Sequence, residues 1–267
     1  MLDRNVLLMG ALAGATIFLG LPIAFLRRGR RLKNIMNAVA IGILLFLLVE
    51  VLQKGWEPVE TGFATANGVY APGIAMLLIF AAGLFVGLLS LVWFEYYYLH
   101  RAAMRQGAPT TPGSVSPQAL SLMIAIGIGL HNFSEGLAIG ASAANGALSF
   151  ALLLAVGFAL HNTTEGFGIA APLHGTKPTW GFLALAGLIG GGPTFVGAVL
   201  GSLWTNEYLN VAFLALAGGA LLYVIKELLH HTRRIEHPRE AFSLMTAVAA
   251  GVLLGFGTDL VLTLSGA

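Results

Sequence analysis

Long apolar runs separated by short polar stretches make up almost the whole chain. A helix needs about twenty residues to cross roughly 30 Å of hydrocarbon, and windows of that length predict eight membrane-spanning helices. Their expected bounds are 5–26, 34–53, 72–100, 118–143, 147–172, 179–203, 208–231 and 240–264. The runs do not alternate and are about twice the length of a membrane-barrel strand. The pattern therefore predicts an all-α integral membrane protein.

The polar stretches between these runs are too short to divide the chain. The longest, 54–71 and 101–117, are expected to be loops between spans, so residues 1–267 are predicted to form a single transmembrane domain. Several spans carry closely spaced small residues, as in GALAGA and GLIGGGP. Small residues let helix backbones approach one another where lipid gives no hydrophobic reason to associate. A compact bundle of eight helices follows, and the same small-residue faces permit a homodimer.

Composition supports a membrane location and limits the chemistry. The chain is 57% hydrophobic and 10% charged, and it contains no cysteine. Disulfides and thiolate metal sites are therefore excluded, and a metal would be held mainly by nitrogen and oxygen ligands. The first span ends in RRGRRLK, a stop-transfer pattern, so we do not expect it to be a removable signal peptide.

The net charge of +2 would suggest a nucleic-acid partner only if the basic residues formed one surface. In an eight-span arrangement all but two of them lie at loops on one side, which the positive-inside rule identifies as the cytoplasm. We therefore expect a multi-pass protein of the cell membrane, with both termini outside the cytoplasm and no nucleic-acid partner. The two exceptions are Arg4 and Lys54.

Two polar motifs interrupt the apolar runs. HNFSEG occupies positions 131–136 and HNTTEG positions 161–166, each near the middle of a predicted span. Because consecutive spans run in opposite directions, the pair is a local inverted repeat at mid-membrane depth. Transporters use this arrangement for a central site.

The spacing within each motif brings its polar side chains together. Residues four apart on a helix share a face, with Cβ atoms about 6 Å apart, so the histidine and glutamate of each copy can point at one spot. Each asparagine, about 100° around the helix, can flank that spot. The residues that would converge are His131, Asn132, Glu135, His161, Asn162 and Glu165.

The two glutamates need a positive partner. A lone glutamate at the centre of a bilayer costs at least about 2.5 kcal/mol, and no Lys or Arg lies near the middle of any predicted span. The partner is then a proton, an imidazolium or a bound metal, and imidazole with carboxylate suits Zn²⁺ or Fe²⁺. The alternative is that the polar side chains only hydrogen-bond one helix to another.

With these motifs the sequence resembles the ZIP family (Zrt-, Irt-like proteins) of metal transporters. The resemblance covers the eight spans, both ends outside, and HNxPEG-like motifs in spans four and five. It implies uptake of a divalent cation into the cytoplasm by alternating access, with Zn²⁺ foremost and Fe²⁺, Mn²⁺ and Cd²⁺ as further substrates. The cation is then cargo rather than a cofactor, and the six motif residues form the transport site.

Three departures from the family's pattern change what is expected of that site. Many members have proline before the glutamate, where this chain has Ser134 and Thr164, so a kink would need hydroxyl back-bonding or the following glycines. Span six carries Gly190–Gly192 where many bacterial members have a glutamate. The sequence therefore does not indicate whether one metal or two would bind. Span two offers no central methionine, because Met36 lies too near the cytoplasmic end. Loss of that soft ligand shifts preference toward harder ions.

Three acidic residues lie outside the motifs. Glu227, about a turn from the cytoplasmic end of span seven, could relay ions to the exit, or it could be an exposed residue paired with Lys226 or Arg233. Glu50 and Asp259 are expected near the outer ends of spans two and eight, where helix-end solvation accounts for them. Five histidines gather on the cytoplasmic side, and interfacial positions account for them: His100, His174, His230, His231 and His237.

Two other functions are compatible with a polar centre in a membrane. An intramembrane zinc-dependent hydrolase could use the same residues to activate water, but the chain has neither HExxH nor GxSxG. A scaffold, or a carrier of an organic solute, would not explain the duplicated motif. The sequence therefore favours a transporter and no enzymatic activity.

Overall fold

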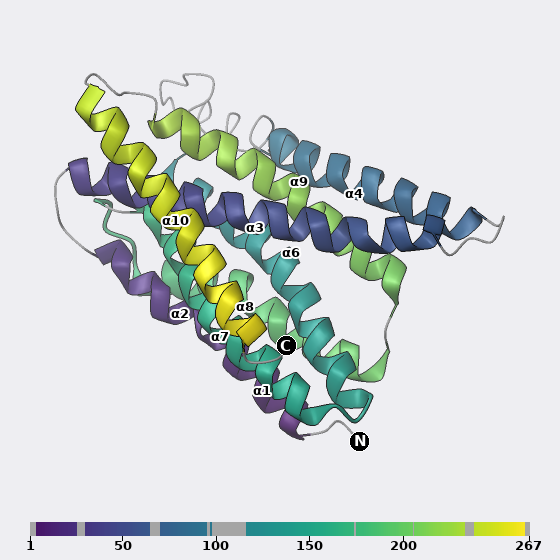
Figure 1. The fold of residues 1–267 in the computed structure, drawn as a ribbon. Helices are drawn as coiled ribbons and strands as arrows, with labels where there is room; N and C mark the ends of the chain where they lie inside the picture. Colours follow the sequence, from purple (N-terminus) through teal and green to yellow (C-terminus); the bar gives the residue numbers. More distant parts are fainter. Residues whose placement is uncertain are drawn as a thin grey trace.

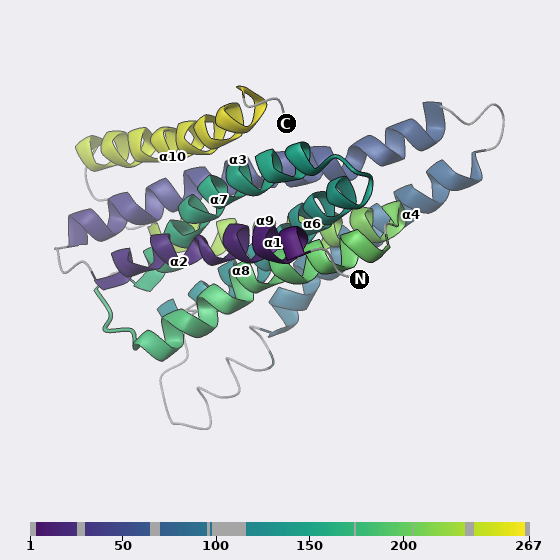
Figure 2. The same cartoon turned by 90° about the horizontal axis from the view of Figure 1, so that it is seen from below.

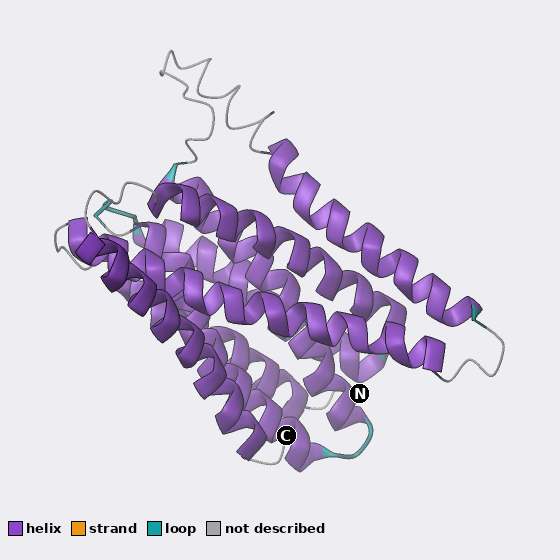
Figure 3. Cartoon of the chain, turned by 45° about the horizontal axis from the view of Figure 1, so that its top comes forward, coloured by secondary structure: helices purple, strands orange, loops and turns teal. Residues whose placement is uncertain are grey.

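The computed structural model describes residues 4–25, 30–64, 70–94, 97, 116–173, 175–204, 206–232 and 238–264. Within these ranges the backbone is helical apart from short turns, and no strand is present (Figures 1 and 3). The elements are α1 Arg4–Ala15, α2 Ile17–Gly20, the 3₁₀ helix η1 Leu21–Phe25, α3 Arg30–Ala64, α4 Ala71–Phe94, α6 Pro117–Ala144, α7 Leu148–Ala170, the 3₁₀ helix η3 Ala171–Leu173, α8 Trp180–Leu203, α9 Glu207–Thr232 and α10 Pro238–Leu264.

The predicted all-α membrane protein is confirmed. In the described part of the chain, seven helical segments are long and apolar enough to cross a membrane. Helix α7 is 23 residues long but is not one of the seven. It carries HNTTEG, whose polar residues lower its mean hydropathy, and it lies inside the bundle against α1, α2, α3, α6 and α10. Many large apolar side chains point outward, among them Leu188, Leu253 and Phe85, as expected of helices that face lipid.

Helix α3 departs from its predicted bounds. The sequence predicted a span over 34–53 and then a loop, but one helix of 35 residues continues to Ala64. Its outer part is stabilised by packing: Val59 is fully buried, and Gly55 lies close to Phe80 of α4 and Leu214 of α9. These contacts come from distant parts of the chain, so the apolar run alone does not reveal them.

Helices α3, α6 and α9 form the interior of the bundle, whereas α4 and α10 lie at its edges (Figures 1 and 2). The predicted close approach through small residues is observed. A side chain at Gly14 of α1 would collide with the backbone of Gly191 in α8, and one at Gly42 of α3 would collide with α10 near Gly251. Glycine is therefore required where these backbones touch.

The helices alternate in direction along the bundle. Helix α1 begins and α10 ends at the same end of the molecule (Figures 1 and 2). Helices α6 and α7, joined by the turn 145–147, are antiparallel neighbours, so their two motifs are brought side by side. Inverted-repeat character beyond these two motifs stays a prediction.

Candidate metal centre

The two motifs meet in the core of the bundle. The ring centroids of His131 and His161 are 6.1 Å apart. Asn132 donates its side-chain amide from α6 to Oε2 of Glu165 on α7, at 2.8 Å. All four side chains are buried. The predicted convergence of two helices on one polar spot is therefore present in the structure.

Each motif also makes the pairing that four-residue spacing predicts. Nε2 of His131 lies 3.3 Å from Oε1 of Glu135, and Nε2 of His161 lies 3.6 Å from Oε1 of Glu165. Both carboxyl groups are almost completely shielded from solvent. Neither oxygen of Glu135 has a hydrogen-bond partner among the described residues.

A third acidic residue, Glu50 of α3, joins the two histidines. Its Oε2 lies 3.9 Å from Nε2 of His161, and one ligand atom from each of Glu50, His131 and His161 falls within 4.8 Å of the others. The expectation that Glu50 is a solvated helix-end residue is wrong, because α3 continues to Ala64 and places Glu50 well inside the bundle. A signal was present: Glu50 interrupts the apolar run LLVEVL.

Lys54 lies one turn further along α3 and bonds the same carboxylate. Its Nζ is 2.6 Å from Oε1 of Glu50 and 5.9 Å from the ring centroid of Phe158 on α7. The prediction that no basic side chain lies at the depth of the motif carboxylates is therefore wrong. It failed for the same reason as the prediction for Glu50, because Lys54 was assigned to a loop that is helix.

The hydrogen bonds of Thr258 on α10 fix the orientation of His161. The threonine hydroxyl donates its one proton to the carbonyl oxygen of Gly255 at 2.8 Å, and its oxygen lies 3.3 Å from Nδ1 of His161. With the hydroxyl proton on that carbonyl, the oxygen can accept from Nδ1–H in the tautomer that is protonated there. In the neutral ring this leaves the lone pair on Nε2, which faces Glu50 and Glu165. Such a lone pair can accept a proton from a neighbouring carboxyl group or bind a cation.

A polar cavity of about 690 Å³ extends from this centre. It begins at His131 and Glu135 and reaches Asn145 and Glu207, near the ends of α6 and α9. Asp259, which was expected at an outer helix end, also lines it. The cavity thus joins the buried centre to one end of the bundle. Its remaining lining residues include Lys54, Glu57, Thr61, Ser134, Ser142 and Asn210.

Asn162 is the one motif residue whose amide is directed elsewhere. Its Nδ2 donates to the backbone carbonyl of Ala13 in α1 at 2.8 Å. The hydroxyl of Thr16 also donates to the carbonyl of Ala13, at 2.7 Å. Thr16 lies between α1 and α2, where the first span is interrupted. The structure therefore links five of the six predicted side chains through a series of pairwise contacts, whereas the amide of Asn162 bonds α1.

The residues that replace proline in the two motifs behave differently. Thr164 back-bonds to the carbonyl of His161 at 2.7 Å, whereas the buried hydroxyl of Ser134 has no partner among the described residues. Helices α6 and α7 continue through both motifs without a break. The glycines instead let neighbouring helices approach closely. A side chain at Gly136 would collide with the carbonyl of Thr194 in α8, and a side chain at Gly166 would collide with the carbonyl of Ile17 in α2.

Helix α8 contributes backbone rather than a carboxylate. Asn132 donates a second hydrogen bond, at 3.1 Å, to the carbonyl oxygen of Gly190. The sequence of α8 contains no Asp or Glu. An acidic ligand for a second metal is therefore not available from this helix, as its glycine-rich sequence indicated.

Glu227 is buried at the other end of α9 and pairs with Lys226. It lies twenty residues beyond Glu207, or about 30 Å along the helix, so it belongs to neither the centre nor its polar cavity. Of the five histidines predicted to lie on the cytoplasmic side, His230 is exposed near the end of α9, and the side chain of His231 is not described. The other three lie outside the described residues: His100, His174 and His237.

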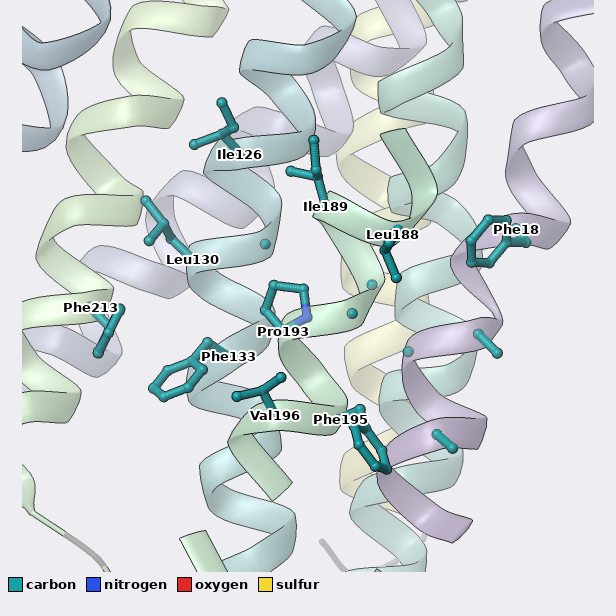
Figure 4. A pocket seen from close by; sticks show the side chains of 16 residues that line it. Phe18, Ile126, Leu130, Phe133, Leu188, Ile189, Pro193, Phe195, Val196 and Phe213 are labelled. Atoms are coloured by element: carbon teal, nitrogen blue, oxygen red, sulfur yellow. The ribbon is translucent and has the colours of Figure 1, made fainter. Parts of the chain in front are cut away.

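A larger cavity, about 900 Å³, lies between α1, α6, α8 and α9 and offers no ligand for an ion. Its lining is entirely apolar, with Phe18, Phe133, Pro193 and Phe213 among the side chains that surround it (Figure 4). An ion in this cavity would lack any oxygen or nitrogen side-chain ligand. Of these two cavities, only the polar one is lined, among the described residues, by side chains that could bind an ion.

Comparison with known proteins gives one family. The family model described as ZIP zinc transporter matches residues 99–263, a range that contains both HN motifs and helices α6 to α9. No match was found among curated proteins. The matched range covers more than half of the chain and includes all five motif residues that meet at the centre, whereas Glu50 lies outside it. The chain therefore belongs to the ZIP zinc transporter family.

Proposed function

We propose that this protein carries divalent transition-metal cations into the cytoplasm through the centre between α3, α6 and α7, with Zn²⁺ as the foremost substrate and Fe²⁺, Mn²⁺ and Cd²⁺ as others. Membership of the family implies divalent metal transport and no enzymatic reaction. The location of the site is supported by the group of Glu50, His131 and His161, whose ligand atoms lie within 4.8 Å of one another.

The formal charge of the centre suits a dication. Three carboxylates, Glu50, Glu135 and Glu165, share the centre with one ammonium, that of Lys54. When all four are ionised they leave a charge of minus two, with neutral histidines. A single divalent cation neutralises it, and nitrogen and oxygen donors without thiolate favour Zn²⁺ and harder ions over softer ones.

Unsatisfied polar atoms support the same assignment. Nε2 of His161, both ring nitrogens of His131 and one oxygen of Glu165 are buried without a hydrogen-bond partner among the described residues. Leaving a buried polar atom unpaired costs about 1–3 kcal/mol, so several such atoms around one point are expected where a ligand binds. A metal ion would satisfy them together.

The transport cycle follows from the position of the centre. His131 and His161 lie near the midpoints of α6 and α7, and the polar cavity leads from them to one end of the bundle. The positive-inside rule makes that end the outer one and puts both termini there. Helices that rock about the fixed centre would expose it to the cytoplasm, where Glu227 offers a buried carboxylate near the end of α9.

The test is metal flux into proteoliposomes. Glu135→Ala and Glu165→Ala should each reduce Zn²⁺ flux to background, because each removes a charge that a dication neutralises. Glu240→Ala is the matched control, since this glutamate is exposed at the start of α10. Normal flux in both motif variants would remove the proposed site. Anomalous scattering at the zinc edge from metal-soaked crystals should place the ion between Glu50, His131 and His161.

A further inference from the structure

Lys54 shares a carboxylate with the proposed metal site. One oxygen of Glu50 accepts a hydrogen bond from Nζ of Lys54 at 2.6 Å, while the other faces Nε2 of His161 at 3.9 Å and has no hydrogen-bond partner among the described residues. Glu50 therefore stands between two cation positions. The first holds the ammonium, and the second holds the metal if the proposed function is correct.

The surroundings of Lys54 allow its ammonium to leave Glu50. The side chain is 42% exposed, whereas that of Glu50 is 12% exposed. Nζ lies near the ring of Phe158, and the same polar cavity is lined by Asp259 and Glu57. A long, flexible lysine side chain can move into this cavity and keep its charge solvated. Both oxygens of Glu50 are then available to the metal.

We propose that Lys54 is a built-in competing cation, which holds Glu50 when the site is empty and weakens the binding of the metal so that it can be released. This inference rests on the proposed function. A centre of three carboxylates and two histidines alone would carry a charge of minus three and would bind a dication more tightly than turnover favours. The ammonium reduces that charge and competes with the metal for the charge of the same carboxylate, through its other oxygen.

A structural role for the ion pair predicts a different result. Lys54 and Glu50 are four residues apart on α3, and partly exposed pairs of this spacing contribute little to stability. If the pair only stabilised the helix or held Glu50 in place, loss of Lys54 would leave metal binding unchanged or weaken it. Competition predicts tighter binding.

The experiment measures ZnCl₂ binding to the full-length, detergent-purified protein by calorimetry, together with flux in proteoliposomes. Lys54→Met should bind zinc about tenfold more tightly, or about 1.4 kcal/mol. Its KM should fall and its maximal rate should also fall, because release becomes slower. Lys54→Arg, which keeps the charge, should resemble wild type. Lys177→Met is the matched control, since Lys177 is exposed outside the centre.

A double variant tests whether Lys54 acts through Glu50. In the Glu50→Gln background, Lys54→Met should change zinc affinity by less than twofold, because the competition has been removed. Equal or weaker zinc binding by Lys54→Met in a protein of normal thermal stability would overturn the proposal. If that variant does not fold, Lys54→Gln is measured with the same criterion. Absence of zinc binding by the wild type would instead overturn the proposed function and this inference with it.

Discussion

The two copies of the HN motif have similar sequences but make different contacts in the folded protein. In both, histidine and glutamate meet across one helical turn, at 3.3 Å in α6 and 3.6 Å in α7. Beyond that pairing they diverge. Neither ring nitrogen of His131 has a hydrogen-bond partner in the described part of the chain, whereas Nδ1 of His161 contacts Thr258. Spacing fixes contacts within a helix, and only packing fixes those between helices.

The asparagines differ more strongly. Asn132 bonds Glu165 and the carbonyl of Gly190, so it joins α6 to α7 and α8 inside the centre. Asn162 bonds the carbonyl of Ala13, so it joins α7 to α1. Because α6 and α7 run in opposite directions and face each other, equivalent positions on the two helices meet different partners. A duplicated motif therefore does not imply two equivalent sets of ligands.

The largest expected effect comes from the residues that the two copies use alike. His131→Ala and His161→Ala should each weaken Zn²⁺ binding by more than the 10- to 100-fold that is typical for loss of an outer-shell partner, because each removes a proposed direct ligand. Isothermal titration on purified protein measures this. If one variant binds zinc as wild type does, the metal does not lie between the two imidazoles.

The asparagine pair separates binding from stability. Asn132→Ala should weaken zinc binding by about 10- to 100-fold, because Glu165 loses the bond that orients it. Asn162→Ala should leave zinc affinity within about twofold while lowering thermal stability, since one interhelical bond in a membrane contributes about 0.6 kcal/mol on average. Calorimetry and thermal unfolding of the two variants decide the matter. The reverse pattern would show that Asn162 is the ligand.

The smallest loss of zinc affinity beyond twofold is expected at Thr258, the threonine that contacts the histidine of only one copy. Thr258→Val should weaken zinc binding by about tenfold, because Nδ1 of His161 loses its acceptor and the ring is no longer held with Nε2 toward the centre. Thr246→Val is the control, since this exposed threonine of α10 donates to the carbonyl of Phe242 in its own helix. Unchanged affinity in the Thr258 variant would mean that packing alone orients His161.

Much of the fold and part of the centre could be predicted from the sequence. Apolar runs of membrane-crossing length gave the helices, and the HN motifs gave the pairs of His131 with Glu135 and His161 with Glu165. These predictions depend on local rules, namely the length of a helix that crosses a bilayer and the spacing of residues on one helical face. The position of Glu50 at the centre was not predicted, because it depends on how far α3 continues.

The sequence by itself determined that the chain is an all-helical membrane protein with a polar centre in two adjacent helices, because hydropathy and helical periodicity are local properties. Only the tertiary structure decided that α3 extends past Glu50 and Lys54, and that Asn162 bonds α1 instead of joining the centre. The physical reason is that packing against α4, α9 and α1 supplies the free energy for these arrangements. Those partners are far away in the sequence and become neighbours only in the folded bundle.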